Sequence, residues 1–149
     1  MWNTKQQEAI EFGNLLHELL SFITTTIDVE SALEKAVETG LIAASEQKQV
    51  EESVNKIIFH PELEVFFNPK YTVMNEQTIV QKVGGLIKPD KIVLAQNNEA
   101  FLLDYKTGKE LPKHQSQLTM YANALEEMGF SVTKKTLIYI GSTIKIIHL

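Results

Sequence analysis

The chain has 149 residues, of which 44% are hydrophobic and 22% charged, and its formal net charge is −5. This balance is typical of one soluble globular domain and excludes a chain that is disordered throughout. No apolar run approaches the ~20 residues of a membrane helix, and no signal-peptide pattern opens the chain. Cysteine is absent, which excludes disulfides, zinc-thiolate sites and iron–sulfur clusters. We therefore expect a single cytoplasmic domain over residues 1–149.

Charge is distributed unevenly along the sequence. Residues 1–104 contain 8 lysines and 16 acidic residues, a net of 8 − 16 = −8, whereas residues 105–149 contain 6 lysines and 3 acidic residues, a net of 6 − 3 = +3. A polyanion is therefore expected on the C-terminal third. Four lysines there are candidate contacts to a nucleic-acid backbone, with a merely solvated surface as the alternative for each: Lys109, Lys113, Lys134 and Lys135.

The first half of the sequence has helical periodicity, with apolar residues recurring every three or four positions. Four segments are expected to be helical: 4–23, 32–37, 42–59 and, after Pro61, 62–67. Asp28 or Ser31 could cap the second helix, and Gly40 is its expected end.

The second half changes to the shorter period of strands. We expect one strand or two short ones over 71–80, further strands over 91–96, 100–106, 136–140 and 143–148, and one helix over 113–128 that ends at Gly129. Gly84-Gly85 separates the segment 71–80 from the strand over 91–96, and Asn97-Asn98 is a hairpin signal. The order predicts an α/β fold in which a helical N-terminal half packs on a mixed central β-sheet.

Charged residues cluster at strand ends between Gly85 and Gly108. Asp104 and Lys106 are two positions apart and so share one face of a strand, and a hairpin at Asn97-Asn98 brings Asp90 opposite Asp104 or one step away. Two carboxylates at one level repel each other unless a cation lies between them, which favours Mg²⁺ or Mn²⁺. Two acids, a metal and a lysine can hydrolyse a phosphodiester. The alternative is an exposed ion pair at a strand end.

Four motifs resemble those of a known family, and they follow one another along the chain in the order typical of that family. Pro89-Asp90, thirteen residues and then Asp104-Tyr105-Lys106 fit the signature of PD-(D/E)XK nucleases. Three flanking motifs are similar to those of the RecB-type branch: the DYKTG segment followed by Gln117-Leu118-Thr119-Met120-Tyr121, the helical Gly13-Asn14-Leu15-Leu16-His17, and Gly84-Gly85 upstream of Asp90. The likeness extends from Gly13 to Ile140 and implies the restriction-endonuclease-like fold. Ile87-Lys88-Pro89 departs from the family pattern.

The resemblance implies roles for individual residues. His17, Asp90, Asp104 and the main-chain carbonyl of Tyr105 would be metal ligands, and Asp90, Asp104 and Lys106 would be the catalytic residues. The substrate would be contacted by Gln117, Tyr121, Lys109 and Lys113, and Glu76 could be a further acid near the site. The alternatives are that His17 is a packed core histidine and that Gln117 and Tyr121 form an ordinary half-buried helix face.

The same resemblance implies a function. We expect a Mg²⁺- or Mn²⁺-dependent deoxyribonuclease, acting as an exonuclease at single-stranded or duplex DNA ends in repair or recombination, with a UvrD/RecB-like helicase as partner. The chain contains no G-x-x-x-x-G-K-[ST] loop, so a helicase would be supplied by another domain or subunit. The chain would then be part of a helicase–nuclease or a free-standing nuclease. The alternatives are an inactive nuclease-fold module that binds DNA or supports a helicase complex, and an endonuclease from another branch of the fold.

Overall fold

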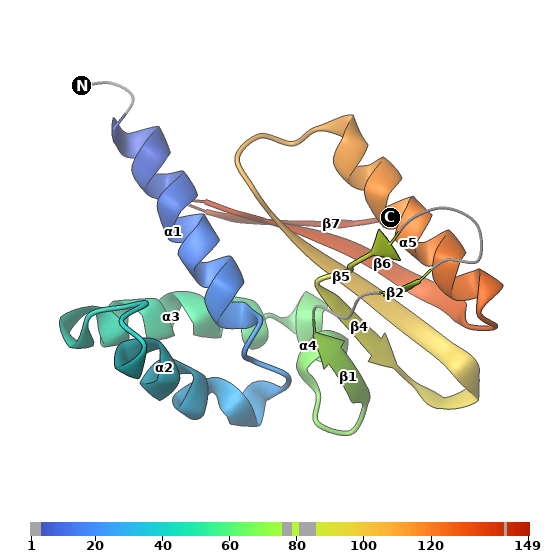
Figure 1. Cartoon of the computed structure of the whole chain (residues 1–149), viewed down its shortest axis with the longest axis horizontal. Helices are drawn as coiled ribbons and strands as arrows, with labels where there is room; N and C mark the ends of the chain where they lie inside the picture. Colours follow the sequence, from blue (N-terminus) through green and yellow to red (C-terminus); the bar gives the residue numbers. More distant parts are fainter. Residues whose placement is uncertain (1–3, 76–78, 81–85, 142) are drawn as a thin grey trace.

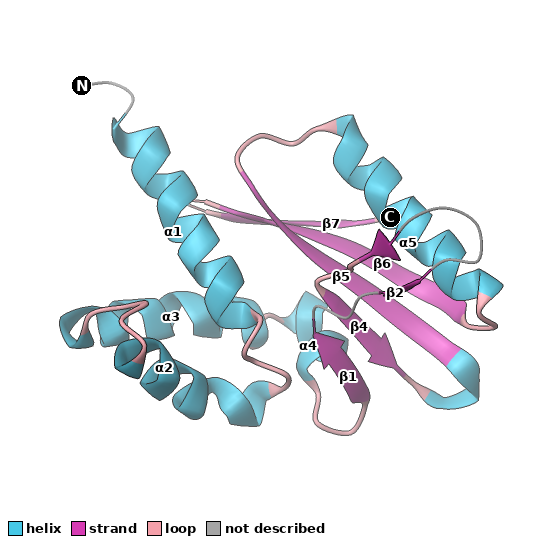
Figure 2. Ribbon diagram, viewed as in Figure 1, coloured by secondary structure: helices cyan, strands magenta, loops and turns pink. Residues whose placement is uncertain are grey.

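The computed structural model describes residues 4–75, 79–80, 86–141 and 143–149. A five-stranded sheet lies in the middle, with α1 to α4 gathered beside one face and α5 packed on the other (Figures 1 and 2). The α/β class and the mixed sheet predicted from the sequence are confirmed. Glu76 and the glycine pair Gly84-Gly85 lie outside the described residues. None of the described helices is long and apolar enough to cross a membrane.

The helical layer differs from the periodicity at its element ends: α1 and α3 are shorter than predicted, whereas α2 begins three residues earlier. Its members are α1 (Thr4–Leu20), η1 (Thr26–Asp28), α2 (Val29–Glu38), η2 (Ala44–Glu46), α3 (Gln47–Ile58), η3 (Pro61–Leu63) and α4 (Glu64–Phe67). The expected third helix over 42–59 is wrong at its start, where the chain forms η2 instead. Asp28 precedes α2 but does not cap it with its side chain, because its carboxylate accepts the main-chain N–H groups of Thr24 and Thr25.

The strands form one large and one small sheet. They are β1 (Thr72–Asn75), β2 (Ile79–Val80), β3 (Leu86–Ile87), β4 (Lys91–Leu94), β5 (Glu99–Thr107), β6 (Ser131–Ile140) and β7 (Ile144–His148). The large sheet has the order β1-β4-β5-β6-β7, while β2 pairs with β3. Only the β5–β6 pair of the large sheet is parallel, and α5 (Pro112–Glu127) makes the crossover between these two strands.

A tight connection joins β4 to β5. The 3₁₀ turn η4 (Gln96–Asn98) carries Asn97 and Asn98, each with φ 59°, a left-handed conformation that asparagine tolerates better than most residues. The predicted hairpin is therefore confirmed, and it sets the register in which Lys91 faces Leu103 and Leu94 faces Ala100.

The two faces of β5 contact two separate apolar clusters. Phe101, Leu103 and Tyr105 pack with the helical layer, and Leu102 packs with α5 and Ile92. This is the period-2 alternation of a strand buried on both sides. Asp104 and Lys106 follow Leu102 on the face that α5 covers, so the charged residues of β5 lie under one helix.

Candidate active site

Two aspartates meet where β4 begins beside the end of β5. The register that pairs Lys91 with Leu103 continues to bring Asp90 opposite Asp104. The main-chain N–H of Asp90 donates to Oδ1 of Asp104 at 3.1 Å, and the N–H of Tyr105 donates to Oδ2 of Asp90 at 2.8 Å. The predicted proximity of the two acids is therefore observed. Asp104 is only 2% exposed, so the alternative of an exposed strand-end ion pair is wrong.

The two carboxyl groups have opposite pKa shifts. Burial, the charge of Asp90 and the contact with Asp90 raise the pKa of Asp104 to about 7, against the opposing effect of Lys106. Burial alone would raise the pKa of Asp90, but the hydrogen bond and charge of His17, with the contacts to Asp104 and the Tyr105 amide, bring it below its usual value. The pair therefore resists carrying two negative charges, as close carboxylates do when no cation compensates them.

His17 reaches the acid pair from α1. Its Nε2 lies 3.0 Å from Oδ1 of Asp90, and its ring centroid lies 5.4 Å from that of Tyr105. The side chain of His17 is 33% exposed, so it is a site-facing residue with a packed ring rather than a core histidine.

Gly13, one turn before His17, explains how α1 comes so close to the sheet. A Cβ at this position would lie 2.7 Å from Cγ2 of Thr107 and 2.9 Å from the carbonyl oxygen of Ile140. Asn14 adds a hydrogen bond, because its Oδ1 accepts from Oγ1 of Thr107 at 3.1 Å. The glycine and asparagine of the G-x-x-x-H motif thus fix α1 against the end of β5 and aim His17 at Asp90.

Lys106 connects the acid pair to α5. Its Nζ lies 3.0 Å from Oδ2 of Asp104 and donates to Oε1 of Gln117. Tyr121 is one helical turn beyond Gln117. Burial and the charges of Asp104 and Asp90 raise the pKa of Tyr121 to about 12, which places its hydroxyl in the field of the two acids. Gln117 therefore contacts the site lysine. Tyr121 is 6% exposed and packs in the apolar cluster between α5 and the sheet, so its substrate contact stays a prediction.

These contacts form one continuous chain across four segments. His17 of α1 contacts Asp90, Asp90 contacts Asp104 of β5, Asp104 pairs with Lys106, and Lys106 bonds Gln117 of α5. Tyr105, whose carbonyl the sequence predicts as a ligand, lies in β5 between Asp104 and Lys106. Among the described residues, no three His, Cys, Asp or Glu side chains converge as a ready-made metal cage.

The candidate backbone lysines do not form a single surface. Lys109 and Lys113 are exposed near the end of β5 and the start of α5. Lys134 instead faces Phe101 in the β5–β6 register, and its Nζ lies 5.9 Å from the centre of the Phe101 ring. Because Phe101 packs with the helical layer, Lys134 lies away from Asp104.

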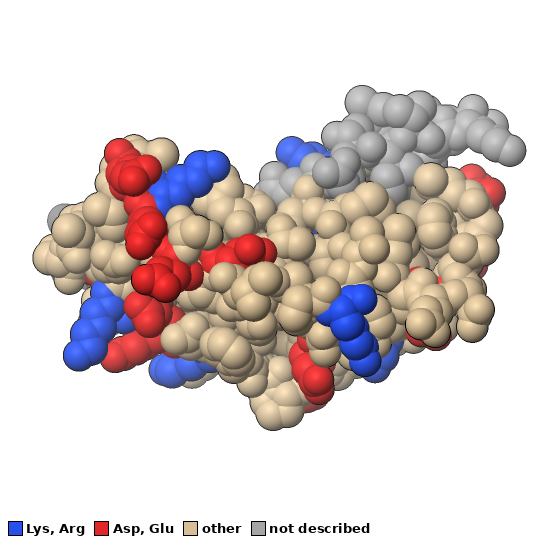
Figure 3. All heavy atoms as spheres, turned by 90° about the horizontal axis from the view of Figure 1, so that it is seen from below, with Lys and Arg blue, Asp and Glu red and all other residues tan. Residues whose placement is uncertain are grey.

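Acidic side chains are concentrated on the surface of the helical half of the molecule. Figure 3 shows Asp and Glu residues gathered over the part of the face where the first helices lie. Five acids on α2 and α3 are exposed: Glu30, Glu34, Glu38, Glu51 and Glu52. A polyanion is therefore expected to approach from the side of α5.

The structure brings in residues that the sequence analysis missed. Lys91 is fully buried, and its Nζ donates to the carbonyl oxygens of Ile23 and Thr24 and to Oδ1 of Asn75. On the other face, His114 of α5 bonds Tyr139 of β6. Neither contact has a local sequence signal, because each depends on how distant segments cross.

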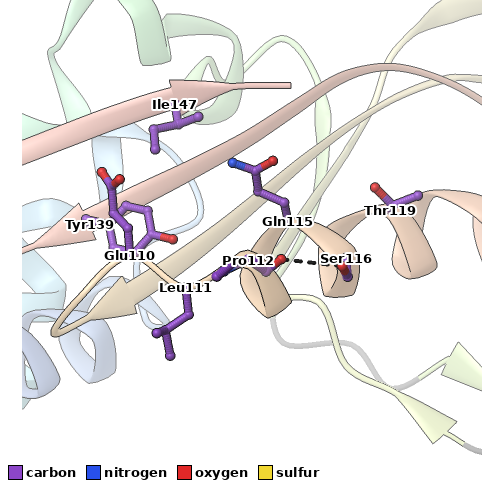
Figure 4. Close-up of a pocket in the computed structure, with 8 residues that line it drawn as sticks. All are labelled: Glu110, Leu111, Pro112, Gln115, Ser116, Thr119, Tyr139 and Ile147. Atoms are coloured by element: carbon purple, nitrogen blue, oxygen red, sulfur yellow. Dashed lines mark hydrogen bonds between the residues drawn. The ribbon is translucent and has the colours of Figure 1, made fainter.

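A surface hollow of about 760 Å³ lies apart from the acid site. Figure 4 shows that it lies between α5 and the last two strands, with Gln115 and Thr119 on one side and Ile147 on the other. Tyr139, on its wall, is the residue that connects this hollow with the site face of α5.

One of three comparisons with known proteins identifies a family for this chain. The family model of the PD-(D/E)XK nuclease superfamily matches residues 2–147. A search of curated proteins found no match. Among solved structures, one described as "Crystal structure of SSO0001" aligns over 99% of this chain and 79% of its own, with 17% identity and a TM-score of 0.39. With the family model matching almost the whole length, the chain belongs to the PD-(D/E)XK nuclease superfamily, which indicates nuclease activity on DNA and the restriction-endonuclease-like fold.

Proposed function

We propose that the chain is a divalent-metal-dependent deoxyribonuclease whose active site is the His17–Asp90–Asp104–Lys106–Gln117 chain of contacts. The observation that carries this proposal is the continuity of that chain, because it joins side chains from separate sequence motifs: His17, Asp90, Asp104, Lys106 and Gln117. An inactive module would need no such connection and no buried acid pair.

The donor set is chemically suited to a hard divalent cation, which nucleases of this superfamily generally use. Asp90 and Asp104 supply carboxylate oxygens. Burial first, and then the charge of Asp90, raise the pKa of Asp104 to about 7, and a bound cation would offset both effects. His17 would add an imidazole nitrogen and Tyr105 a main-chain carbonyl. When bound, the cation would polarise the phosphate and activate water.

The chain's own residues would orient and stabilise the reacting phosphate. The ammonium of Lys106, held by Asp104 and Gln117, points its charge at the acid pair and would stabilise the negative charge that develops on the phosphate. Tyr121 and Gln117 would contact the DNA backbone from α5, with Lys109 and Lys113 adding long-range attraction. Gly13 and Asn14 keep His17 in place.

We further propose an exonuclease that acts at DNA ends in repair or recombination, together with a UvrD/RecB-like helicase domain or subunit. Support comes from residues of the RecB-type motifs: Gly13 lets α1 approach the sheet, His17 contacts Asp90, and Gln117 contacts Lys106. The negative helical half would also leave the isolated chain with weak affinity for DNA, which a helicase partner could offset.

Matched DNA substrates test the proposal. Linear duplex, linear single-stranded and covalently closed circular DNA are incubated with Mg²⁺ or Mn²⁺, and the products are sized. We expect linear DNA to be degraded from its ends while circles stay intact. Cutting of circles would show an endonuclease, and no cutting of any substrate by the folded chain would favour the inactive module.

A further inference from the structure

A histidine at the start of α5 has one ring nitrogen in hydrogen bonds and the other without a partner among the described residues. Nδ1 of His114 lies 2.8 Å from the hydroxyl oxygen of Tyr139 and 3.4 Å from the main-chain nitrogen of Leu111. A main-chain N–H can only donate, so Nδ1 is the acceptor and the ring proton is on Nε2. Within the described part of the chain, Nε2 makes no hydrogen bond, and the His114 side chain is partly exposed.

This imidazole belongs to the same row of side chains as the substrate-facing residues of α5. His114, Gln117 and Tyr121 are three and four positions apart, which places them on one face of the helix. Tyr139, which holds His114, is the partner of Lys106 in the parallel β5–β6 register. His114 is therefore tied through Tyr139 to the strand position directly beside the catalytic lysine.

The environment keeps His114 an uncharged donor. Partial burial and the charges of Lys106 and Lys113 lower its pKa. A neutral N–H suits a phosphate oxygen next to a lysine, because it binds the oxygen without adding a competing positive charge.

The neighbours of His114 indicate which phosphate this donor would meet. His114 lies one helical turn before Gln117, whose Oε1 accepts from Nζ of Lys106. Tyr139, which contacts His114, is the strand partner of Lys106. A strand with its scissile phosphate at Lys106 would therefore bring a neighbouring phosphate toward His114.

We propose that His114 is a further substrate-binding residue, which donates Nε2–H to a non-bridging oxygen of the phosphate adjacent to the scissile one, with Tyr139 as its positioning residue. The inference rests on the proposed nuclease function. It adds a contact at the exposed end of the α5 row, beyond the residues of the sequence motifs.

The test combines variants of the full chain with DNA that carries one altered phosphate. Binding of a single-stranded oligonucleotide is measured with Ca²⁺ in place of Mg²⁺, and cleavage kinetics are measured with Mg²⁺. We expect His114→Ala to raise Kd and KM roughly tenfold with kcat nearly unchanged, since a hydrogen bond to a charged group is lost. Tyr139→Phe should give a smaller increase, and His114→Gln, which keeps a side-chain donor, should restore most of the affinity.

A methylphosphonate scan locates the contact. A neutral methylphosphonate at the adjacent phosphate should weaken wild-type binding and abolish the difference between wild type and His114→Ala, whereas the same change several phosphates away should leave the difference intact. His60→Ala is the matched control, because His60 caps η3 in the helical layer, and it should bind like wild type.

Other outcomes overturn the inference. Unchanged Kd and KM in His114→Ala, additive effects of the variant and the adjacent methylphosphonate, or a loss confined to kcat would each contradict it. These results differ from a failure of the nuclease proposal itself, in which wild type would neither bind nor cut any DNA. Melting curves of each variant exclude misfolding as the cause of a change.

Discussion

Two lysines, one on each face of the central sheet, lie close in sequence to the two site aspartates, and their surroundings differ. Lys91 follows Asp90 directly, is fully buried under the helical layer, and contacts main-chain carbonyls, Asn75 and the ring of Phe67 at 4.3 Å. Lys106 follows Asp104 by two positions, is 19% exposed, and contacts a carboxylate and Gln117. Lys91 thus has buried, uncharged partners, whereas Lys106 pairs with a carboxylate and stays partly open to solvent.

The largest effect is expected from replacing Lys106, because only this lysine should be needed for DNA cleavage. Lys106→Met should lower the rate of DNA cleavage by about 10²–10³-fold, because a single charge that stabilises the transition state is lost. Metal affinity, measured by calorimetry, should stay nearly intact, since Lys106 acts on the phosphate. Lys109→Met is the control and should retain most of the activity. A collapse of metal affinity in Lys106→Met would show that we have its role wrong.

Gly13→Ala should disturb the face that positions His17. The added Cβ would lie 2.7 Å from Thr107, so α1 must shift away from the sheet. Overpacking of this kind costs about 1–3 kcal/mol, which lowers Tm by about 3–10 °C in a chain of this size. Calorimetry and Mn²⁺ titration should both register the change.

Gly141→Ala is the matched control for the shift of α1, because a Cβ there meets only the carbonyl oxygen of Thr143 at an ordinary 3.8 Å. It should leave Tm and metal affinity near the wild-type values. If Gly13→Ala behaved the same way, the close approach of α1 would not be what aims His17 at Asp90.

His17→Ala tests whether α1 contributes to metal binding. Removal of the imidazole leaves an all-oxygen donor set, which suits Mg²⁺ better than Mn²⁺. We expect Mn²⁺ affinity to fall by about tenfold and Mg²⁺ affinity to fall less, as read by titration calorimetry. A variant with normal affinity for both ions and a lower Tm would identify His17 as a packing residue.

Lys91→Met should change stability with pH and leave the chemistry alone. Burial lowers the pKa of Lys91 from its usual 10.5 to about 7. Between these values the unfolded chain binds the proton that the folded chain releases, so the free energy of unfolding of wild type should rise as the pH increases from about 7.5 to about 9.5. Urea denaturation at the two pH values measures this rise, and Lys91→Met should remove most of it. An identical slope in both proteins would show that Lys91 stays charged in the fold.

The sequence was sufficient for the parts of the site that local rules control. The short Asn97-Asn98 connection fixes the register of β4 and β5, and alternation then places Asp104 and Lys106 on one face. Helical spacing likewise brings Gln117 and Tyr121 together. These residues lie close together in the chain, so turn types and helix or strand periodicity are enough to predict their positions.

Features that depend on tertiary crossings could not be predicted. β6 begins at Ser131, five residues before the expected strand, because pairing with β5 overrides the polar Lys134-Lys135 pair. Burial of Lys91 depends on carbonyls at the end of α1, 67 and 68 positions away in the sequence. The His114–Tyr139 contact requires the parallel crossover to bring α5 over β6.

The central claim is that the acid pair under α5 holds the metal that cuts DNA. Its most direct test is the cleavage rate of an end-labelled linear duplex by wild type and by Asp104→Asn, each with Mg²⁺ and with excess chelator. The account predicts cutting by wild type only with the metal, and a loss of at least about a hundredfold in Asp104→Asn while its melting curve stays cooperative. Cutting in excess chelator, or an Asp104→Asn variant as active as wild type, would contradict it.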